Sequence, residues 1–141
     1  MLRIARWVYF AFAWLFVVGV VTQVFLAGMV VVARQINWAL HADLGHMEGL
    51  PILLMLVSMY PGHLPGSVKK MTWALLGVFI LQAEVLIFLR VQAPVLSAFH
   101  PVMALVDFAL GLTLARRAWL LTRHAQTPVR LLTELETSAI Q

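Results

Sequence analysis

Hydrophobic residues occur in four long runs, and most charged residues lie between or beyond these runs. About twenty apolar residues are needed for a helix to cross a bilayer. The pattern therefore predicts an all-α protein, a four-helix transmembrane bundle with up-and-down connections. The predicted spans cover residues 7–33, 40–60, 71–89 and 95–116, within one domain over residues 1–122.

Prolines, glycines and polar residues mark the ends of these runs. The segment PGHLPG (residues 61–66) closes the second run as a tight turn, because two prolines and two glycines break a helix. Pro94 is a favourable first-turn residue for the fourth span. Residues 123–141 are polar enough to leave the membrane and are predicted to form a cytoplasmic tail. No short repeat is evident, but a duplication of the first two spans in the last two is left open.

Composition supports a membrane protein and narrows its chemistry. The 141 residues are 62% hydrophobic and 11% charged, with a mean hydropathy of +0.93, which is too apolar for an ordinary soluble surface. The chain has no cysteine, so disulfides, iron–sulfur clusters, thiolate metal sites and covalently attached c-type haem are excluded. Any metal must be held by histidine, methionine or carboxylate side chains.

Lysine and arginine residues predict the orientation. One end of the predicted bundle carries most of them, namely Arg3, Arg6, Lys69, Lys70, Arg116, Arg117, Arg123 and Arg130. The other end has Arg34 and Arg90. The positive-inside rule then places both termini in the cytoplasm. The net charge of +4 is explained by this topology and by attraction to anionic membrane lipid, and no basic groove points to nucleic acid.

Polar residues inside the spans fall at similar depths. His46 and His100 each lie about six residues from the outer end of a span, which corresponds to a depth of roughly 8 to 9 Å. Gln23, Gln82 and Glu84 are predicted in the same outer half of the membrane. A polar layer contributed by all four spans predicts a functional site.

Two histidines at one depth on the second and fourth spans suit haem b. These spans are diagonal in an up-and-down bundle, with axes roughly 12 to 14 Å apart, a gap that an edge-on macrocycle fills. His46 and His100 are therefore predicted as axial ligands of the haem iron. The residues expected around the macrocycle are Gly28, Gly49, Arg34 and Arg90, the arginines pairing with propionates.

Each of these assignments has an alternative. His46 and His100 are also compatible with interfacial residues that hydrogen-bond to lipid headgroups. His41 competes for the ligand role, although it lies nearer the predicted surface. Glu48 is only two residues from His46 and is expected to point to another helix face and reach the interface.

The remaining intramembrane polar residues have two interpretations each. Gln23 and Gln82 are expected to make interhelical hydrogen bonds, with contact to a cofactor or substrate as the alternative. Glu84 and Asp107 are candidates for proton exchange or for structural pairing, since a carboxyl group in the membrane is costly.

Three short segments resemble a family of small four-helix bacterial membrane proteins of unknown function. They are QVFLAG in the first span, HADLGH at the start of the second and FHPVMAL in the fourth, and the resemblance covers most of residues 5–120. The layout is also distantly similar to cytochrome b and to each half of haem A synthase, which implies axial ligands on the second and fourth helices. Where cytochrome b carries a second ligand pair, this chain has Met59 and Thr113, so one haem is expected.

The leading functional hypothesis is a haem b protein of the bacterial cytoplasmic (inner) membrane that transfers electrons, with quinone or a redox protein as partner. Two alternatives remain: a metal or proton transporter that uses the intramembrane histidine and carboxyl groups, and an accessory or pigment-binding subunit of a larger complex. Homo-oligomerisation is compatible with each. Bis-imidazole ligation leaves no open iron position, which argues against oxygen activation. Whether the protein is an enzyme is therefore left open.

Overall fold

The four apolar runs fold into four helical spans in the computed structural model, which describes residues 1–124. Each span is long and apolar enough to cross a membrane; their bounds are Leu2–Val31, Trp38–Met59, Gly66–Phe88 and Pro94–Arg123. The described residues contain no strand, so the predicted all-α, four-helix fold is confirmed. Most of the predicted tail, residues 123–141, lies outside the described residues.

Several spans consist of more than one helix. In chain order the elements are α1 (Leu2–Val31), α2 (Trp38–Met47), α3 (Gly49–Met59), α4 (Gly66–Ile80), the π-helical turn η1 (Leu81–Val85), α5 (Leu86–Phe88), α6 (Pro94–Ser97) and α7 (His100–His124).

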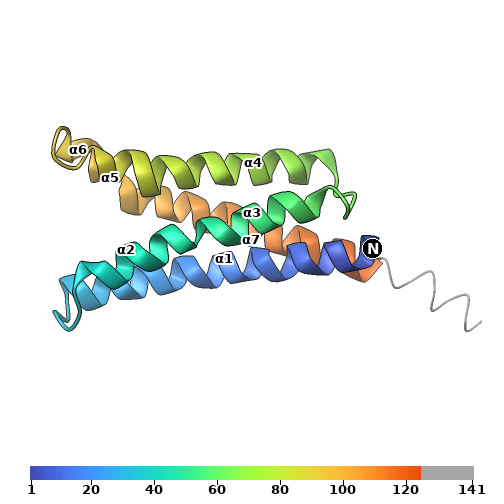
Figure 1. The fold of residues 1–141 in the computed structure, drawn as a ribbon, viewed down its shortest axis with the longest axis horizontal. Helices are drawn as coiled ribbons and strands as arrows, with labels where there is room; N and C mark the ends of the chain where they lie inside the picture. The colour runs from blue at the N-terminus through green and yellow to red at the C-terminus, as the bar shows by residue number, and fades with distance from the viewer. Residues whose placement is uncertain (125–141) are drawn as a thin grey trace, which may run out of the picture.

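The spans run up and down, and the second and fourth are diagonal to each other (Figure 1). α1 packs against α3 and α7, and α4 packs against the same two helices. The N-terminus and the end of α7 lie at the same end of the bundle. At the opposite end, α2 diverges from α5 and α6, and we call this the splayed end.

The hydrophobic core fills the half of the bundle near the N-terminus. Its largest fully buried apolar side chains are those of Tyr9, Phe16, Ile52, Met55, Met59, Leu75 and Leu114. Large apolar residues also cover the outside of the spans, for example Val18, Val21 and Phe25 on α1. An apolar exterior is what a bilayer requires, because lipid tails cannot hydrogen-bond to polar groups.

Three of the four spans are interrupted toward the splayed end. The second span breaks at Glu48, and Pro51 accounts for this because it has no N–H to donate to the carbonyl four residues earlier. The third span widens into η1, and the fourth breaks between Ser97 and His100, just before Pro101. Such breaks release carbonyl groups from the helical pattern and are frequent at functional sites.

A buried hydrogen bond joins α1 to α4 in the core. The hydroxyl groups of Tyr9 and Thr72 are 2.6 Å apart, and neither residue is exposed. The Thr72 hydroxyl donates to the Val68 carbonyl, so the Tyr9 hydroxyl donates to Thr72.

Replacing Tyr9 by phenylalanine is expected to lower the free energy of unfolding by about 0.6 to 1.5 kcal/mol, the usual value of one such bond. The measurement is equilibrium unfolding in mixed detergent micelles. Tyr60→Phe is the matched control, because Tyr60 is 55% exposed. Equal losses in the two variants would show that the buried bond contributes nothing.

Candidate functional site

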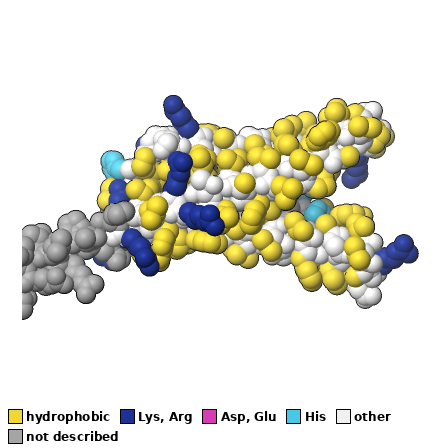
Figure 2. Space-filling view, turned by 180° about the vertical axis from the view of Figure 1, so that it is seen from behind, with side chains coloured by type: hydrophobic (Ala, Val, Ile, Leu, Met, Phe, Trp, Pro, Cys, Tyr) yellow, Lys and Arg dark blue, Asp and Glu magenta, His cyan; other side chains and the backbone are white. Residues whose placement is uncertain are grey.

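The splayed end of the bundle is hollowed, and Figure 2 shows a histidine side chain at the base of the hollow. A cleft of about 360 Å³ lies at this end; its lining residues are His46, Ala83, Glu84, Ile87, Phe88, Arg90 and Val91. The polar groups predicted to form one layer in the outer half therefore lie at or near an accessible cleft. Their individual positions define the candidate site.

His41 and His100 lie opposite each other across the bundle. Their ring centres are 6.3 Å apart and the ring planes are inclined by 72°. The His41 Nδ1 donates to the carbonyl of Gln23 at 3.2 Å, and the His100 Nδ1 donates to the carbonyl of Gln82 at 2.8 Å. η1 frees the second of these carbonyls, because a π-helical turn departs from the usual α-helical bonding.

These two hydrogen bonds fix the tautomer of each neutral ring. A carbonyl oxygen only accepts hydrogen bonds, so Nδ1 carries the proton in His41 and in His100. The lone pair is then on Nε2. Metal-binding histidines nearly always use this arrangement, in which one ring nitrogen donates to a carbonyl or carboxylate and the other binds the metal.

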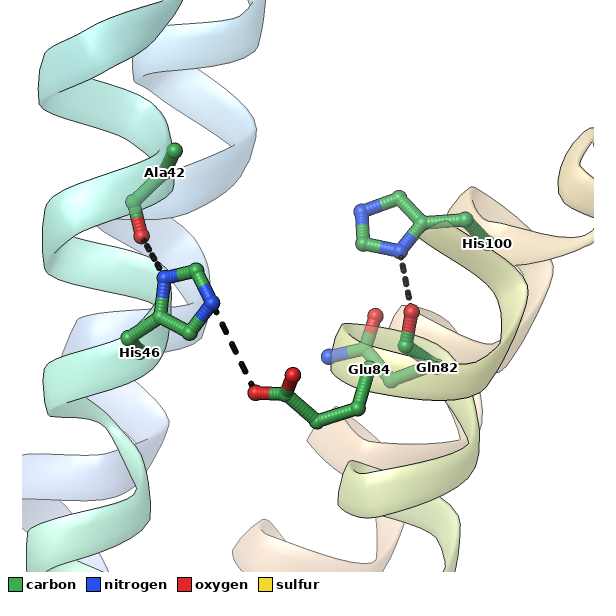
Figure 3. A network of polar contacts seen from close by, with 5 residues as sticks. All are labelled: Ala42, His46, Gln82, Glu84 and His100. Carbon is green, nitrogen blue, oxygen red and sulfur yellow. Dashed lines mark hydrogen bonds and ion pairs between the residues drawn. The ribbon is translucent and has the colours of Figure 1, made fainter. Parts of the chain in front are cut away.

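His46 has a different partner. Its Nδ1 donates to the carbonyl of Ala42 at 2.8 Å, within its own helix, and its Nε2 is 3.5 Å from the Glu84 carboxylate. Figure 3 shows Glu84 extending from η1 across the gap to His46, while His100 is held by Gln82. Both side chains of the pair are more than half exposed. Glu84, a predicted proton or pairing residue, is thus paired with a histidine.

The side chains of Gln23 and Gln82 do not make the predicted interhelical hydrogen bonds. Both polar atoms of the Gln23 amide are buried and have no partner, and the same holds for the Gln82 Oε1. The Gln23 amide lies against Gly45, where a Cβ atom would be 3.4 Å from its nitrogen. Unsatisfied buried polar groups cost about 1 to 3 kcal/mol each, so they call for a ligand or ordered water.

Two carboxyl groups lie deeper in the bundle. Asp107 is fully buried and neither of its carboxyl oxygens has a hydrogen-bond partner. Glu48 is 9% exposed and packs on Gly19 of α1, so the expectation that it reaches the interface is wrong. Gly111, one turn after Asp107 on α7, packs on Phe16 and Val17 of α1.

The other predicted cofactor residues are distributed around the splayed end. Arg90 lines the cleft, while Arg34 is exposed in the turn after α1 with a φ of 55°. Gly28 has open space around the position of a Cβ atom, and its predicted contact with a flat cofactor stays a prediction. Gly49 instead faces the Phe79 ring, 3.3 Å from the position of a Cβ atom, and so serves helix packing.

The site has an internal two-fold repeat. Three polar pairs are each separated by 59 residues: Gln23 and Gln82, His41 and His100, and Glu48 and Asp107. Buried positions repeat at the same interval; the pairs are 9 and 68, 13 and 72, 16 and 75, 20 and 79, 52 and 111, 55 and 114, 56 and 115, and 59 and 118. Both histidine-to-carbonyl bonds also join residues 18 apart. The structure thus supports the two-helix duplication that the sequence left open.

The spacing of 59 residues is the sequence signal that would have identified His41 and Glu48 as site residues. Each histidine of the repeat is followed by a carboxyl residue seven positions later, and each is preceded by a glutamine 18 positions earlier. The two halves face each other because the second and fourth spans are diagonal. His46 and Glu84 have no counterpart in the repeat, since Leu105 and Phe25 occupy the equivalent positions.

Comparison with known proteins gives a family without an assigned function. Residues 23–87 match a family described as "Family of unknown function (DUF6220)", which confirms the predicted resemblance to a helical family of that kind. The matched segment contains His41, His46 and Glu48 and ends just beyond η1. No curated protein and no solved structure matched the chain.

Proposed function

We propose that this protein binds one haem b between His41 and His100 and transfers electrons within the membrane. The observation that carries the proposal is the pair of imidazole rings with centres 6.3 Å apart, each held through its Nδ1 by a backbone carbonyl. Histidine is the usual axial ligand of haem iron in membrane cytochromes, and two histidines suffice.

The spacing of the two rings fits this ligation. Metal–nitrogen bonds of about 2.0 to 2.1 Å and ring bonds of about 1.3 to 1.4 Å separate the centres of two opposed imidazoles by roughly 6.4 Å. The rings of His41 and His100 are 6.3 Å apart. Their inclination of 72° is compatible, because rotation of a ring about the iron–nitrogen bond leaves the spacing unchanged.

The choice of ligands differs from the pair first expected, His46 and His100. His41 occupies the position equivalent to His100 in the repeat, whereas His46 is engaged with Glu84. In this proposal Gln23 and Gln82 orient the two ligands through their carbonyl groups. Arg90, at the cleft, is the candidate partner for a propionate.

The chemistry proposed for the site is outer-sphere electron transfer. Bound haem supplies a one-electron iron couple, and two histidine ligands leave no open position on the iron. The apolar spans keep the site within the membrane. A membrane quinone, or a redox protein that docks at the splayed end, is the proposed electron partner. The bacterial cytoplasmic membrane, with both termini inside, remains the proposed location.

A metal-ion transporter is a weaker proposal. Among residues 1–124, no three histidine or carboxyl side chains come together as ligands for a metal ion. Haem iron needs only two protein ligands, so the observed pair favours haem over a free cation. Proton transfer has more support, from Asp107 and Glu48, and is compatible with electron transfer at the same site.

The electron-transfer proposal is tested by redox titration of the haem-loaded protein in detergent. The expected result is one reversible one-electron transition per chain, together with reduction by a soluble quinol analogue. Asp43→Asn is the matched control, because Asp43 is exposed on α2 and is not among the residues that line the cleft. A chain that binds no haem, or haem that no quinol or dithionite reduces, would contradict the proposal.

A further inference from the structure

A second site lies below the histidine pair, formed by Glu48 and Asp107. Asp107 has no exposed surface, and both of its oxygens lack a partner. A buried carboxylate with no partner is strongly disfavoured, because nothing replaces its lost hydration. The group must therefore be neutral, or share a proton with a neighbour.

Glu48 is that neighbour. It comes from the diagonal span, is nearly fully buried and packs on Gly19 of α1, while Gly111, one turn after Asp107, packs on Phe16 and Val17 of the same helix. Two carboxyl groups in such a position cannot both ionise cheaply, so they tend to share a proton. The internal repeat also places them at equivalent positions of its two halves.

Within residues 1–124, no lysine or arginine side chain is positioned to neutralise this pair. The titratable groups on the elements that pack around it are Arg3, Arg6 and Tyr9 on α1, His41, Asp43 and His46 on α2, Lys69 and Lys70 on α4, Glu84 on η1, and His100, Arg116, Arg117, Arg123 and His124 on α7. Tyr9 is bonded to Thr72, and the lysines and arginines are at the far end of their helices. The closest of these groups along the chain is His46, two residues before Glu48, whose ring is engaged with Glu84. His41 and His100 come seven residues before Glu48 and Asp107, respectively.

The two layers are close enough to sense each other's charge. Seven residues are two helical turns, so each carboxyl lies on the same helix face as its histidine and roughly 10 Å deeper. At such a distance in a medium of low dielectric constant, a change of one unit charge at the histidine layer alters the proton affinity of the carboxyl pair.

We propose that Glu48 and Asp107 hold one shared, exchangeable proton and bind a second when an electron reaches the site between His41 and His100. The coupling to an electron rests on the proposed function, whereas the shared proton does not. In the step, the electron comes from the reduced donor and the proton from water at the splayed end. The carboxylate and carboxylic acid of the pair become two carboxylic acids, and the added charges balance.

The proton is expected to enter from the splayed end. On the other side of the pair, the closely packed core of Phe16, Met55 and Leu114 closes the bundle. The splayed end holds the cleft and the His46–Glu84 pair, which reaches into it. A one-sided path allows the pair to store a proton without conducting it across the membrane.

The shared proton is tested first, by infrared spectroscopy of the haem-free protein in detergent. A band from a protonated carboxyl group is expected at neutral pH, where ordinary Asp and Glu are ionised, and it should shift in D₂O. Asp107→Asn and Glu48→Gln should each remove or shift this band, while Asp43→Asn, at an exposed position on α2, should leave it unchanged. If a variant fails to fold, Asp107→Glu and Glu48→Asp replace it, and each should shift the band without removing it.

Two results would overturn the inference. The first is a wild-type protein with no protonated carboxyl band at neutral pH. The second is a band that all variants at Glu48 and Asp107 leave unaltered. Either result leaves haem binding untouched, so it is distinguishable from failure of the proposed function.

The coupling is tested in the haem-loaded protein by the infrared difference between its reduced and oxidised states. Reduction is expected to increase the carboxyl band, and Asp107→Asn should abolish this change. The midpoint potential of the wild type should also fall with rising pH, by up to about 59 mV per pH unit for one proton per electron. A redox-active haem with no carboxyl signal and a potential independent of pH would overturn the coupling.

Discussion

Replacing His41 or His100 by alanine is expected to abolish six-coordinate haem binding, whereas the same change at His46 leaves it intact. Each of the first two variants removes one of the two opposed rings whose centres are 6.3 Å apart. His46 has its Nε2 directed at Glu84, and its loss removes only an exposed ion pair. Apparent haem affinity should fall more than about 100-fold in the first two variants. Mutation of residues that only orient the metal ligands already lowers metal affinity by 10- to 100-fold.

The measurement is titration of the haem-free variants with hemin, followed by the Soret absorbance. His41→Ala and His100→Ala should also respond to added imidazole, which fills the space left by the side chain and restores the two-ligand spectrum. Circular dichroism shows whether each variant is helical. Loss of binding in His46→Ala with retention in His41→Ala would reverse the assignment of the ligands.

Replacing Gly111 by valine is expected to lower the free energy of unfolding by about 1 to 3 kcal/mol, the usual cost of overpacking a core. A Cβ atom at this position would be 2.8 Å from one Phe16 ring carbon and 3.1 Å from the next. Phe16 is fully buried, so its ring has no free direction in which to move. The substitution therefore separates α1 from α7 or displaces the ring.

The measurement is equilibrium unfolding in mixed detergent micelles. Gly77→Ala is the matched control, because no atom lies within 4 Å of a Cβ atom built there. Alanine is favoured over glycine in a helix by up to about 1 kcal/mol, so this control should be neutral or stabilising. Equal destabilisation in both variants would show that close packing at Gly111 is not the cause.

The sequence was sufficient to predict the spans and their connections. Long apolar runs form helices in a bilayer, because the backbone N–H and C=O groups must be hydrogen-bonded within the segment. The segment PGHLPG requires a turn between the second and third spans. The observed spans differ from the predicted bounds by at most seven residues, at the end of the fourth span. There the chain stays helical through Arg116 and Arg117, because a helix does not stop where its hydrophobic pattern stops.

The ligand pair was harder to predict. A uniform helical rise per residue from the start of each span predicts that His46 and His100 lie at the same depth in the membrane. The fourth span instead begins with α6 and a turn before α7, so residues there are not spaced as in one straight helix. His41 consequently lies opposite His100. The geometry therefore favours His41 over His46 as the second ligand.

Glu48 was misplaced for a different reason. Its distance of two residues from His46 correctly predicts a different helix face, but that face packs on Gly19 of α1 and does not reach the interface. The repeat of 59 residues is the stronger signal, because it relates Glu48 to Asp107 without any assumption about helix geometry.

The central claim is that two histidines of the repeat bind one haem. Its most direct test is the optical spectrum of the detergent-purified wild-type protein, oxidised and dithionite-reduced, after expression with haem supplied and with the haem quantified per chain. The account predicts one haem b per chain, with a Soret band and sharp α and β bands on reduction, typical of two-imidazole ligation. A folded protein that remains colourless would contradict it.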